Sequence, residues 1–168
     1  MDPMDTAMLL IRAWIGVVML AHGINHARTQ EGTARWFEKI GFKSPQMNAR
    51  LSALSELAIG AGLLVGLLTS VALAGTIATM AVAFWSVHRY AGFFVFRRPD
   101  EGYEYVTTLA VAALVIAIVG PGAYSLDAAF GLRDALDGWV GAAIALAGLV
   151  AAALQLATFY RPDRSGGE

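Results

Sequence analysis

The chain has 168 residues, of which 57% are hydrophobic and only 15% are charged, with a formal net charge of −1 and no cysteine. Soluble domains contain about 45–50% apolar and about 25% charged residues. The composition therefore excludes a disordered chain, a disulfide-rich domain and a nucleic-acid-binding protein, and it favours an integral membrane protein. The absence of cysteine excludes redox chemistry through a thiol, a disulfide or a cysteine-held cluster of this chain.

Five continuous apolar segments follow one another, at residues 8–27, 51–68, 71–87, 106–119 and 139–160. None of them alternates as a barrel strand does, and a helix satisfies its own backbone groups within lipid. A spanning helix needs about 20 apolar residues, so five spans use most of the chain. We therefore predict an all-α integral membrane protein that forms a single membrane domain over residues 1–168. It would contain a four-helix transmembrane bundle and a fifth, C-terminal transmembrane helix.

The second apolar segment carries small residues at a four-residue spacing. Ala58, Gly62 and Gly66 follow this spacing, with Gly60 nearby. Small residues at such a spacing let helix backbones approach closely in lipid. The pattern predicts a helix contact and says nothing about chemistry.

Lysine and arginine residues gather in alternate loops. Ten of them fall on one side of the predicted bundle, namely Arg28, Arg35, Lys39, Lys43, Arg50, Arg89, Arg97, Arg98, Arg161 and Arg164. Arg133 alone falls on the other side, while Arg12 lies within the first span. Because cytoplasmic loops are enriched in these residues, we expect the N-terminus outside and residues 161–168 as a cytoplasmic tail.

Several ionisable side chains lie within the predicted spans, where they are costly and are functional candidates by default. His22 and His26 share a face of the first span, and Glu56 enters the second span from the same, cytoplasmic side. His88 ends the third span there, and residues 103–105 begin the fourth. These groups are expected to converge in the inner half of the bundle.

Three interpretations of this cluster stay open. His and Tyr donors backed by a carboxylate suit the headgroup of a quinone, whose carbonyls accept hydrogen bonds and take up protons on reduction. Alternatively, a metal ion would take nitrogen and oxygen ligands from His22, His26, Glu56 and His88. In the third interpretation, Glu56 and a histidine or arginine neutralise each other and lock two helices together.

Arg12 lies alone near the outer end of the first span. Asp127, in the loop after the fourth span, is within reach at that depth. We expect a structural role for both, as an ion pair or with the arginine extended toward the interface.

Four sequence pieces then occur in a recognisable order within residues 8–130. They are Leu10-Ile11-Arg12 with Ala21-His22-Gly23; Ser55-Glu56-Leu57 with Gly60 and Gly62; His88 through Gly92-Phe93-Phe94 with Gly102-Tyr103-Glu104-Tyr105; and Gly120-Pro121-Gly122-Ala123-Tyr124-Ser125-Leu126-Asp127. Together these pieces resemble the DoxX family of small bacterial membrane proteins. The extra helix within residues 131–160 lies outside the four-helix core that the family shares.

The resemblance implies a four-helix bundle in the bacterial cytoplasmic (inner) membrane, linked to quinone-coupled redox chemistry. The family takes its name from a subunit of a thiosulfate:quinone oxidoreductase, and some members are described in complexes with superoxide dismutase and a sulfurtransferase. By position, the family motif residues are Arg12, His22, Glu56, Glu104 and Asp127. This chain departs from the family at Asn25-His26, where members often carry a Gln-Lys type pair, and a thiosulfate activity without cysteine requires a partner or a mechanism without thiols.

We therefore predict a quinone-reactive membrane oxidoreductase component that binds menaquinone or ubiquinone, and leave open whether it is itself an enzyme. His22 and Glu56 are the predicted catalytic residues, the first bonding the quinone and the second relaying protons. The predicted binding residues are His22, His26, Glu56, His88, Tyr103, Glu104 and Tyr105. The alternative is a non-catalytic scaffold that docks soluble redox or oxidative-stress partners through its basic loops, Arg97 and Arg98 among them. A homo-oligomer also stays open.

Overall fold

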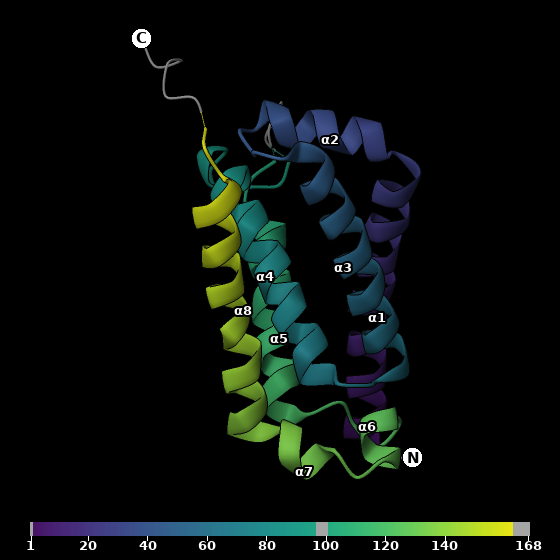
Figure 1. Ribbon diagram of the computed structural model, residues 1–168. Coiled ribbons are helices and arrows are strands. Elements are labelled where there is room, and N and C mark those ends of the chain that lie inside the picture. Colours follow the sequence, from purple (N-terminus) through teal and green to yellow (C-terminus); the bar gives the residue numbers. More distant parts are fainter. Residues whose placement is uncertain (1, 97–100, 163–168) are drawn as a thin grey trace.

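The computed structural model describes residues 2–96 and 101–162. Five long helices make up a bundle (Figure 1). They are α1 (Pro3–Arg28), α3 (Pro45–Val65), α4 (Thr69–Ser86), α5 (Glu104–Val119) and α8 (Gly138–Phe159). Each helix coincides with one of the apolar segments, and no β-strand is found in the described residues. The prediction of an all-α protein is confirmed.

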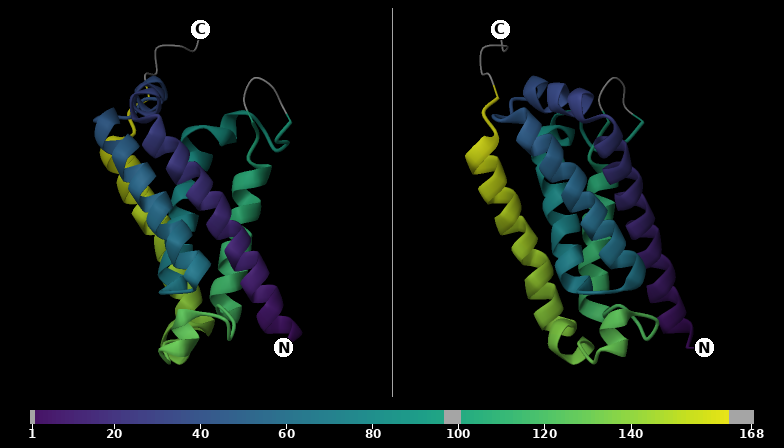
Figure 2. Two further views of the ribbon diagram at one scale, coloured as in Figure 1. Left: turned by 90° about the vertical axis from the view of Figure 1, so that its right-hand side faces the viewer. Right: turned by 45° about the vertical axis from the view of Figure 1, so that its right-hand side comes forward.

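Shorter helices cover the two ends of the bundle. α2 (Gln30–Lys39) crosses one end, close to the 3-10 turn η1 (His88–Tyr90), whereas α6 (Leu126–Ala129) and α7 (Arg133–Leu136) lie at the opposite end (Figure 1). The chain starts at the α6 end and leaves the bundle at the α2 end (Figure 2). An odd number of long helices therefore brings the two termini to opposite ends, as the five-segment pattern predicts.

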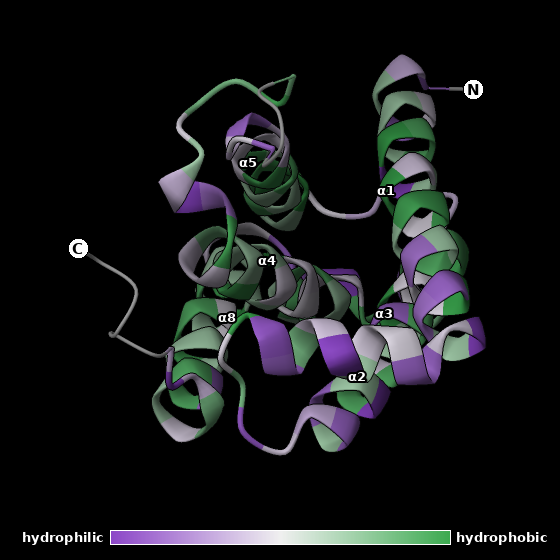
Figure 3. Ribbon diagram, turned by 90° about the horizontal axis from the view of Figure 1, so that it is seen from above, coloured by the Kyte–Doolittle hydropathy of each residue, from purple (hydrophilic) through white to green (hydrophobic). Residues whose placement is uncertain are grey.

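Three helices are long and apolar enough to cross a membrane, namely α1, α4 and α8. α5 is apolar but has only 16 residues. α3 has 21 residues, but its first turns are polar and include Asn48 and Arg50. Seen from the α2 end, the long helices are mainly hydrophobic, while α2 shows its hydrophilic residues (Figure 3). A multi-pass membrane protein is therefore supported, and the count of five spans stays a prediction.

Helices α1 and α3 approach each other closely through glycines. A Cβ placed on Gly60 would lie 2.8 Å from the carbonyl oxygen of Gly16, and one placed on Gly16 would lie 3.0 Å from the oxygen of Gly60. Gly60 shares the buried face of α3 with Glu56 and Leu63. The predicted small-residue contact is therefore made by Gly60 toward α1, while Gly62 lies beside Ala72 of α4. Ala58 is exposed, and Gly66 caps the C-terminus of α3 with a φ of 67°.

The fifth long helix is an integral part of the bundle. It packs on α4 at Gly148, where an added Cβ would overlap the carbonyl of Ala74, and on α5 at Gly141, beside the carbonyl of Ala117. Its C-terminal end is tied to the α2–α3 connection, because Lys43 N donates to Phe159 O at 2.8 Å. α8 thus contributes to the same core as the first four long helices.

Arg12 and Asp127 are both buried, but they bind backbone groups and not each other. The guanidinium of Arg12 donates to the carbonyls of Leu63 and Leu64 at the end of α3, and to Tyr124 O at 2.8 Å. The Asp127 carboxylate accepts the two backbone N–H groups that begin α4, from Leu68 at 2.7 Å and Thr69 at 2.8 Å.

No salt bridge joins Arg12 to Asp127 in the described structure, so the ion pair expected from the sequence is not found there. A helix C-terminus attracts a cation and a helix N-terminus attracts an anion, and the α3–α4 turn presents one of each. The two side chains stabilise this turn from opposite sides. Arg12 is 0% exposed, so it does not extend toward the interface either.

Candidate functional site

A cavity of about 530 Å³ lies toward the α2 end, between α1, α3, α4 and α5. Much of its wall is apolar and includes Met19, Met80 and Val106. Its ionisable and polar lining residues include His22, His26, Ser52, Ser55, Glu56, His88, Glu101, Tyr105 and Gln155. The cavity therefore combines an apolar volume with a small number of hydrogen-bonding groups.

Glu56 is the buried carboxylate of this cavity, with only 3% of the residue exposed. The Ser52 hydroxyl, one turn earlier on α3, donates to Glu56 Oε1 at 3.0 Å. The Ser52 oxygen also lies 3.1 Å from Nδ1 of His26, so it can accept a hydrogen bond from that nitrogen. Because a serine oxygen has both a donor and acceptor lone pairs, the three side chains form a continuous chain of hydrogen bonds.

The second carboxylate oxygen of Glu56 is less satisfied. Oε2 lies 3.0 Å from Nδ1 of His26, which is ion-pair distance, but it is buried without a hydrogen-bond partner in the described structure. The two atoms are close but form no hydrogen bond, because Nδ1 lacks the alignment with Oε2 that a hydrogen bond requires. A buried unpaired acceptor is costly, so Oε2 is the atom of this site best placed to take up a proton or a donor from a ligand.

His22 also lines the cavity, but it contacts His26 and not Glu56. The two imidazole rings meet edge to face with centroids 6.3 Å apart. His22 is exposed on α1 and forms no hydrogen bond or ion pair within the described structure. The histidine beside Glu56 is therefore His26, one turn further along α1 than expected, while the ring nitrogens of His22 remain available to a ligand.

Two further expected residues lie on the cavity wall, and two lie beside it. His88 Nδ1 is 2.7 Å from the carbonyl oxygen of Glu101, and Tyr105 is 39% exposed. Tyr103 instead packs edge to face on Phe84, with centroids 5.4 Å apart. Glu104 accepts a hydrogen bond from Val95 N at 3.2 Å. Neither Tyr103 nor Glu104 is among the lining residues of the cavity.

Exposed residues line the cavity at more than one place. His22 on α1 and Tyr105 on α5 both line it and are both exposed. Only a few residues of α1 and α5 come into contact, since α1 packs mainly on α3 and α5 packs mainly on α4 and α8. Near the α2 end, Trp36, Val95 and Glu101 are exposed residues of the cavity lining as well.

Ser52 and Gln155 are polar cavity residues that reasoning from the sequence missed. Ser52 lies four residues before Glu56, a spacing that puts two side chains on one helix face, so a signal for it was present. Gln155 comes from α8 and donates to Asn48 Oδ1 at 3.3 Å. The sequence signal for Gln155 is a single amide side chain within an apolar span. Polar side chains in a span face the protein interior.

The alternative of a metal site finds no geometric support. In the described residues, no group of three or more His, Asp or Glu side chains is arranged to hold a metal ion. His22 and His26 lie one turn apart and Glu56 approaches only one of them. The third interpretation, an interaction that holds two helices together, agrees with the distance between His26 on α1 and Glu56 on α3.

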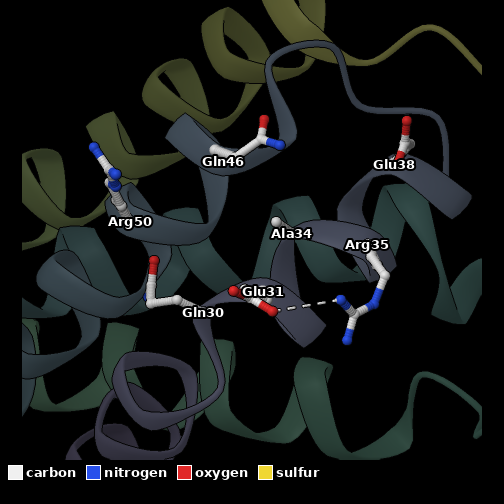
Figure 4. A pocket seen from close by; sticks show the side chains of 7 residues that line it. All are labelled: Gln30, Glu31, Ala34, Arg35, Glu38, Gln46 and Arg50. Atoms are coloured by element: carbon white, nitrogen blue, oxygen red, sulfur yellow. Dashed lines mark ion pairs between the residues drawn. The ribbon is translucent and has the colours of Figure 1, made fainter.

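A second, polar pocket of about 260 Å³ lies at the α2 end, over α2 and the start of α3 (Figure 4). Glu31 and Arg35 form a 3.8 Å ion pair on its rim, and Figure 4 shows Gln46 and Arg50 across from it. Arg97 and Arg98, the other residues expected to dock a partner, lie outside the described residues.

Comparison with known proteins identifies one family. Residues 7–89 match the DoxX family. They contain most of α1 and all of α2, α3 and α4, together with Arg12, His22, Glu56 and His88. Glu104 and Asp127 lie beyond the matched residues. No curated protein and no solved structure matches the chain. The match includes the first pieces that carried the resemblance, and the predicted resemblance to the DoxX family is confirmed over residues 7–89.

Proposed function

We propose that the cavity binds the headgroup of a quinone, menaquinone or ubiquinone, and that the protein is a quinone-reactive component of a membrane oxidoreductase. The observation that carries this proposal is the buried Glu56 carboxylate, with an unsatisfied oxygen, on the wall of an otherwise apolar cavity. Small-molecule pockets of about 300–1,000 Å³ with apolar walls and a few polar groups are typical binding sites.

The residues present fit a quinone headgroup. Met19, Met80 and Val106 supply an apolar surface for a flat ring. His22 and Tyr105 supply donors for carbonyl oxygens, because an imidazole N–H and a phenol O–H both donate. A bound quinone supplies redox chemistry in which two electrons and two protons are taken up.

The protein's contribution in this proposal is to hold and move a proton. Glu56 Oε1 receives the Ser52 hydroxyl, and Ser52 Oγ lies next to His26 Nδ1. A proton on His26 can therefore pass through Ser52 to the carboxylate and be held at the edge of the cavity. Since the chain contains no cysteine, the electrons come from a partner redox protein.

Access from the bilayer suits a lipid-soluble ligand. We infer a lateral opening between α1 and α5, where His22 and Tyr105 line the cavity and are exposed. A quinone with its isoprenoid tail in the lipid would insert only its headgroup, and the apolar wall would exclude water from it. The proposal thus explains why a polar cluster lies beside an opening that faces lipid.

Bound quinone is the direct test. The purified full-length protein is reconstituted with menaquinone or ubiquinone and extracted for quantification by absorbance. Glu56→Gln and His22→Ala should each weaken quinone binding by about tenfold or more, because a hydrogen bond to a charged group contributes about 1.5–3 kcal/mol. Glu38→Gln, an exposed carboxylate of α2 outside the cavity, is the matched control. Absence of quinone from a mild detergent preparation would refute the function, and equal binding by all variants would refute the site.

We also propose that the α2 end faces the cytoplasm, in the inner membrane of a bacterium. The support is charge, because this end carries Arg28, Arg35, Lys39 and Arg50, whereas the α6 end carries Arg133 beside Asp134. The positive-inside rule assigns the basic loops to the cytoplasm. The N-terminus would then lie outside.

A docking role is the second candidate, favoured by the polar pocket over α2 (Figure 4). Glu31, Arg35 and Glu38 are exposed there, and an exposed charged surface guides the association of proteins. A soluble redox partner that binds this surface would be lost from co-purification when Arg35 and Arg50 are changed to Glu. Quinone bound in the cavity would be unaffected by the same changes.

A further inference from the structure

A groove of about 900 Å³ runs between α4 and α8 near the α2 end. Its floor is made of small and aliphatic side chains, including Ala81, Leu149, Ala152, Ala153 and Leu156. It lies on a different face of α4 from the cavity, which is lined by Val82, Ala83 and Ser86. In a bilayer this floor would face the acyl chains.

A cation stands at the end of the groove. The guanidinium carbon of Arg89 lies 4.0 Å from the ring centroid of Trp85 and 4.4 Å from that of Tyr90. Arg89 also donates to the Tyr90 hydroxyl. Its Nε is buried without a hydrogen-bond partner, and no carboxylate in the described ranges forms a salt bridge with it.

We propose that this groove binds an anionic phospholipid, with an acyl chain on the alanine and leucine floor and the phosphate at Arg89. An arginine that lines a groove without a carboxylate partner among the described residues can pair with an anion, and phosphate matches the planar fork of guanidinium donors. The anions that a bilayer presents at the depth of the helix ends are lipid headgroups. Basic pockets between membrane helices bind such headgroups.

The aromatic residues around Arg89 support this depth. Trp85 and Tyr90 are 47% and 68% exposed, and these two residue types are enriched at the level of the headgroups. Their rings hold the guanidinium in place by cation–π contact, so the charge is positioned before a lipid arrives. The groove and its cation are independent of the proposed quinone site.

Native mass spectrometry of the full-length protein tests the phosphate contact. Phosphatidylglycerol and phosphatidylcholine with the same acyl chains are titrated against the protein in mild detergent. The protein should prefer phosphatidylglycerol, and Arg89→Gln should weaken its binding roughly five- to tenfold. The matched control is Arg35→Gln, because the side chain of Arg35 is 72% exposed on α2. Equal binding of the two lipids, or equal loss in both variants, would overturn the proposal.

A second pair of variants tests the groove and does not depend on Arg89. Ala153→Trp fills the groove and should reduce binding of phosphatidylglycerol, whereas Ala151→Trp, exposed on the same helix but outside the groove, should not. Inorganic phosphate in excess should fail to displace the lipid, since it makes no apolar contact. Displacement by phosphate, or equal effects of the two tryptophans, would show that the groove holds no acyl chain.

Discussion

Three buried charged side chains, Glu56, Arg12 and Asp127, make specific contacts between distant segments of this protein. Glu56 reaches Ser52 and His26, whereas Arg12 binds carbonyls at the end of α3 and Asp127 binds the N–H groups that begin α4. Burial of a charge is costly unless it is compensated by hydrogen bonds or a partner. The Asp127 carboxylate is compensated by backbone N–H groups, and Arg12 binds three backbone carbonyls although its Nε has no hydrogen-bond partner in the described structure. Glu56 keeps one oxygen without a hydrogen bond there. Glu56 lines the cavity whereas Arg12 and Asp127 do not, and this position separates the functional candidate from the structural residues.

Replacement of Arg12 by methionine should lower stability strongly. The change leaves the carbonyls of Leu63, Leu64 and Tyr124 without their donor, and an unsatisfied buried group costs about 1–3 kcal/mol. Thermal unfolding in detergent would measure a lower Tm. Arg35→Met, on the exposed face of α2, should leave the Tm nearly unchanged; similar losses in the two variants would contradict the role of Arg12.

Asp137, which precedes α8, gives a pH-dependent prediction. Burial raises the pKa of its carboxyl above the ordinary 3.8, although the neighbouring Arg133 opposes the shift. The folded state then binds more protons than the unfolded state as the pH rises above 3.8, so this residue makes the protein less stable toward neutral pH. Asp137→Asn should raise the Tm at neutral pH, and the gain should vanish when the pH falls below 3.8. A gain independent of pH would contradict this origin.

Among the helices, α8 shows most clearly how the bundle is built. It lies outside the residues that match the DoxX family, yet it packs against α4 and α5 through Gly148 and Gly141 and contributes Gln155 to the cavity. Van der Waals packing through small residues drives helix association in lipid. α8 therefore supports both the bundle and one wall of the candidate site.

Gly148→Leu should separate α8 from α4. A side chain at this position overlaps the carbonyl of Ala74, and overpacking costs about 1–3 kcal/mol. The expected result is a lower Tm and faster proteolysis in the connection that contains α7. Ala151→Leu, on the exposed face of the same helix, is the control. If the two leucines behave alike, α8 does not depend on this close contact.

At the scale of the whole molecule, the two ends of the bundle differ in their basic residues and in their cavities. The α2 end holds the basic loops, the candidate cavity, the polar pocket and the groove, whereas the α6 end holds the structural contacts of Arg12 and Asp127 (Figure 1). The candidate chemistry is thus confined to the half of the bundle that we assign to the cytoplasmic leaflet.

Cysteine labelling tests this orientation, and the cysteine-free chain makes it clean. In intact cells, a membrane-impermeant thiol reagent should label Asp134→Cys at the α6 end. It should label Lys39→Cys at the α2 end only after the membrane is permeabilised. Both positions are exposed, so accessibility within the protein does not differ. External labelling at Lys39→Cys would reverse the proposed topology.

Hydropathy along the chain was enough to determine the all-α class, the positions of the five long helices and, with a few motif residues, the DoxX family. These properties depend on residues that are near each other in sequence. The same pattern predicted that His22, His26, Glu56, His88 and Tyr105 converge, and all five line one cavity, because polar groups within apolar spans avoid lipid.

Only the tertiary structure decided which of these residues touch. The partner of Glu56 is His26 and not His22, because the packing of α1 on α3 through Gly16 and Gly60 sets their relative height. In the same way, Arg12 meets carbonyls in place of Asp127. A one-turn difference moves a side chain by about 5.4 Å, which is enough to exchange one partner for another. Helix positions follow from local sequence, whereas helix rotation and depth follow from contacts between distant segments.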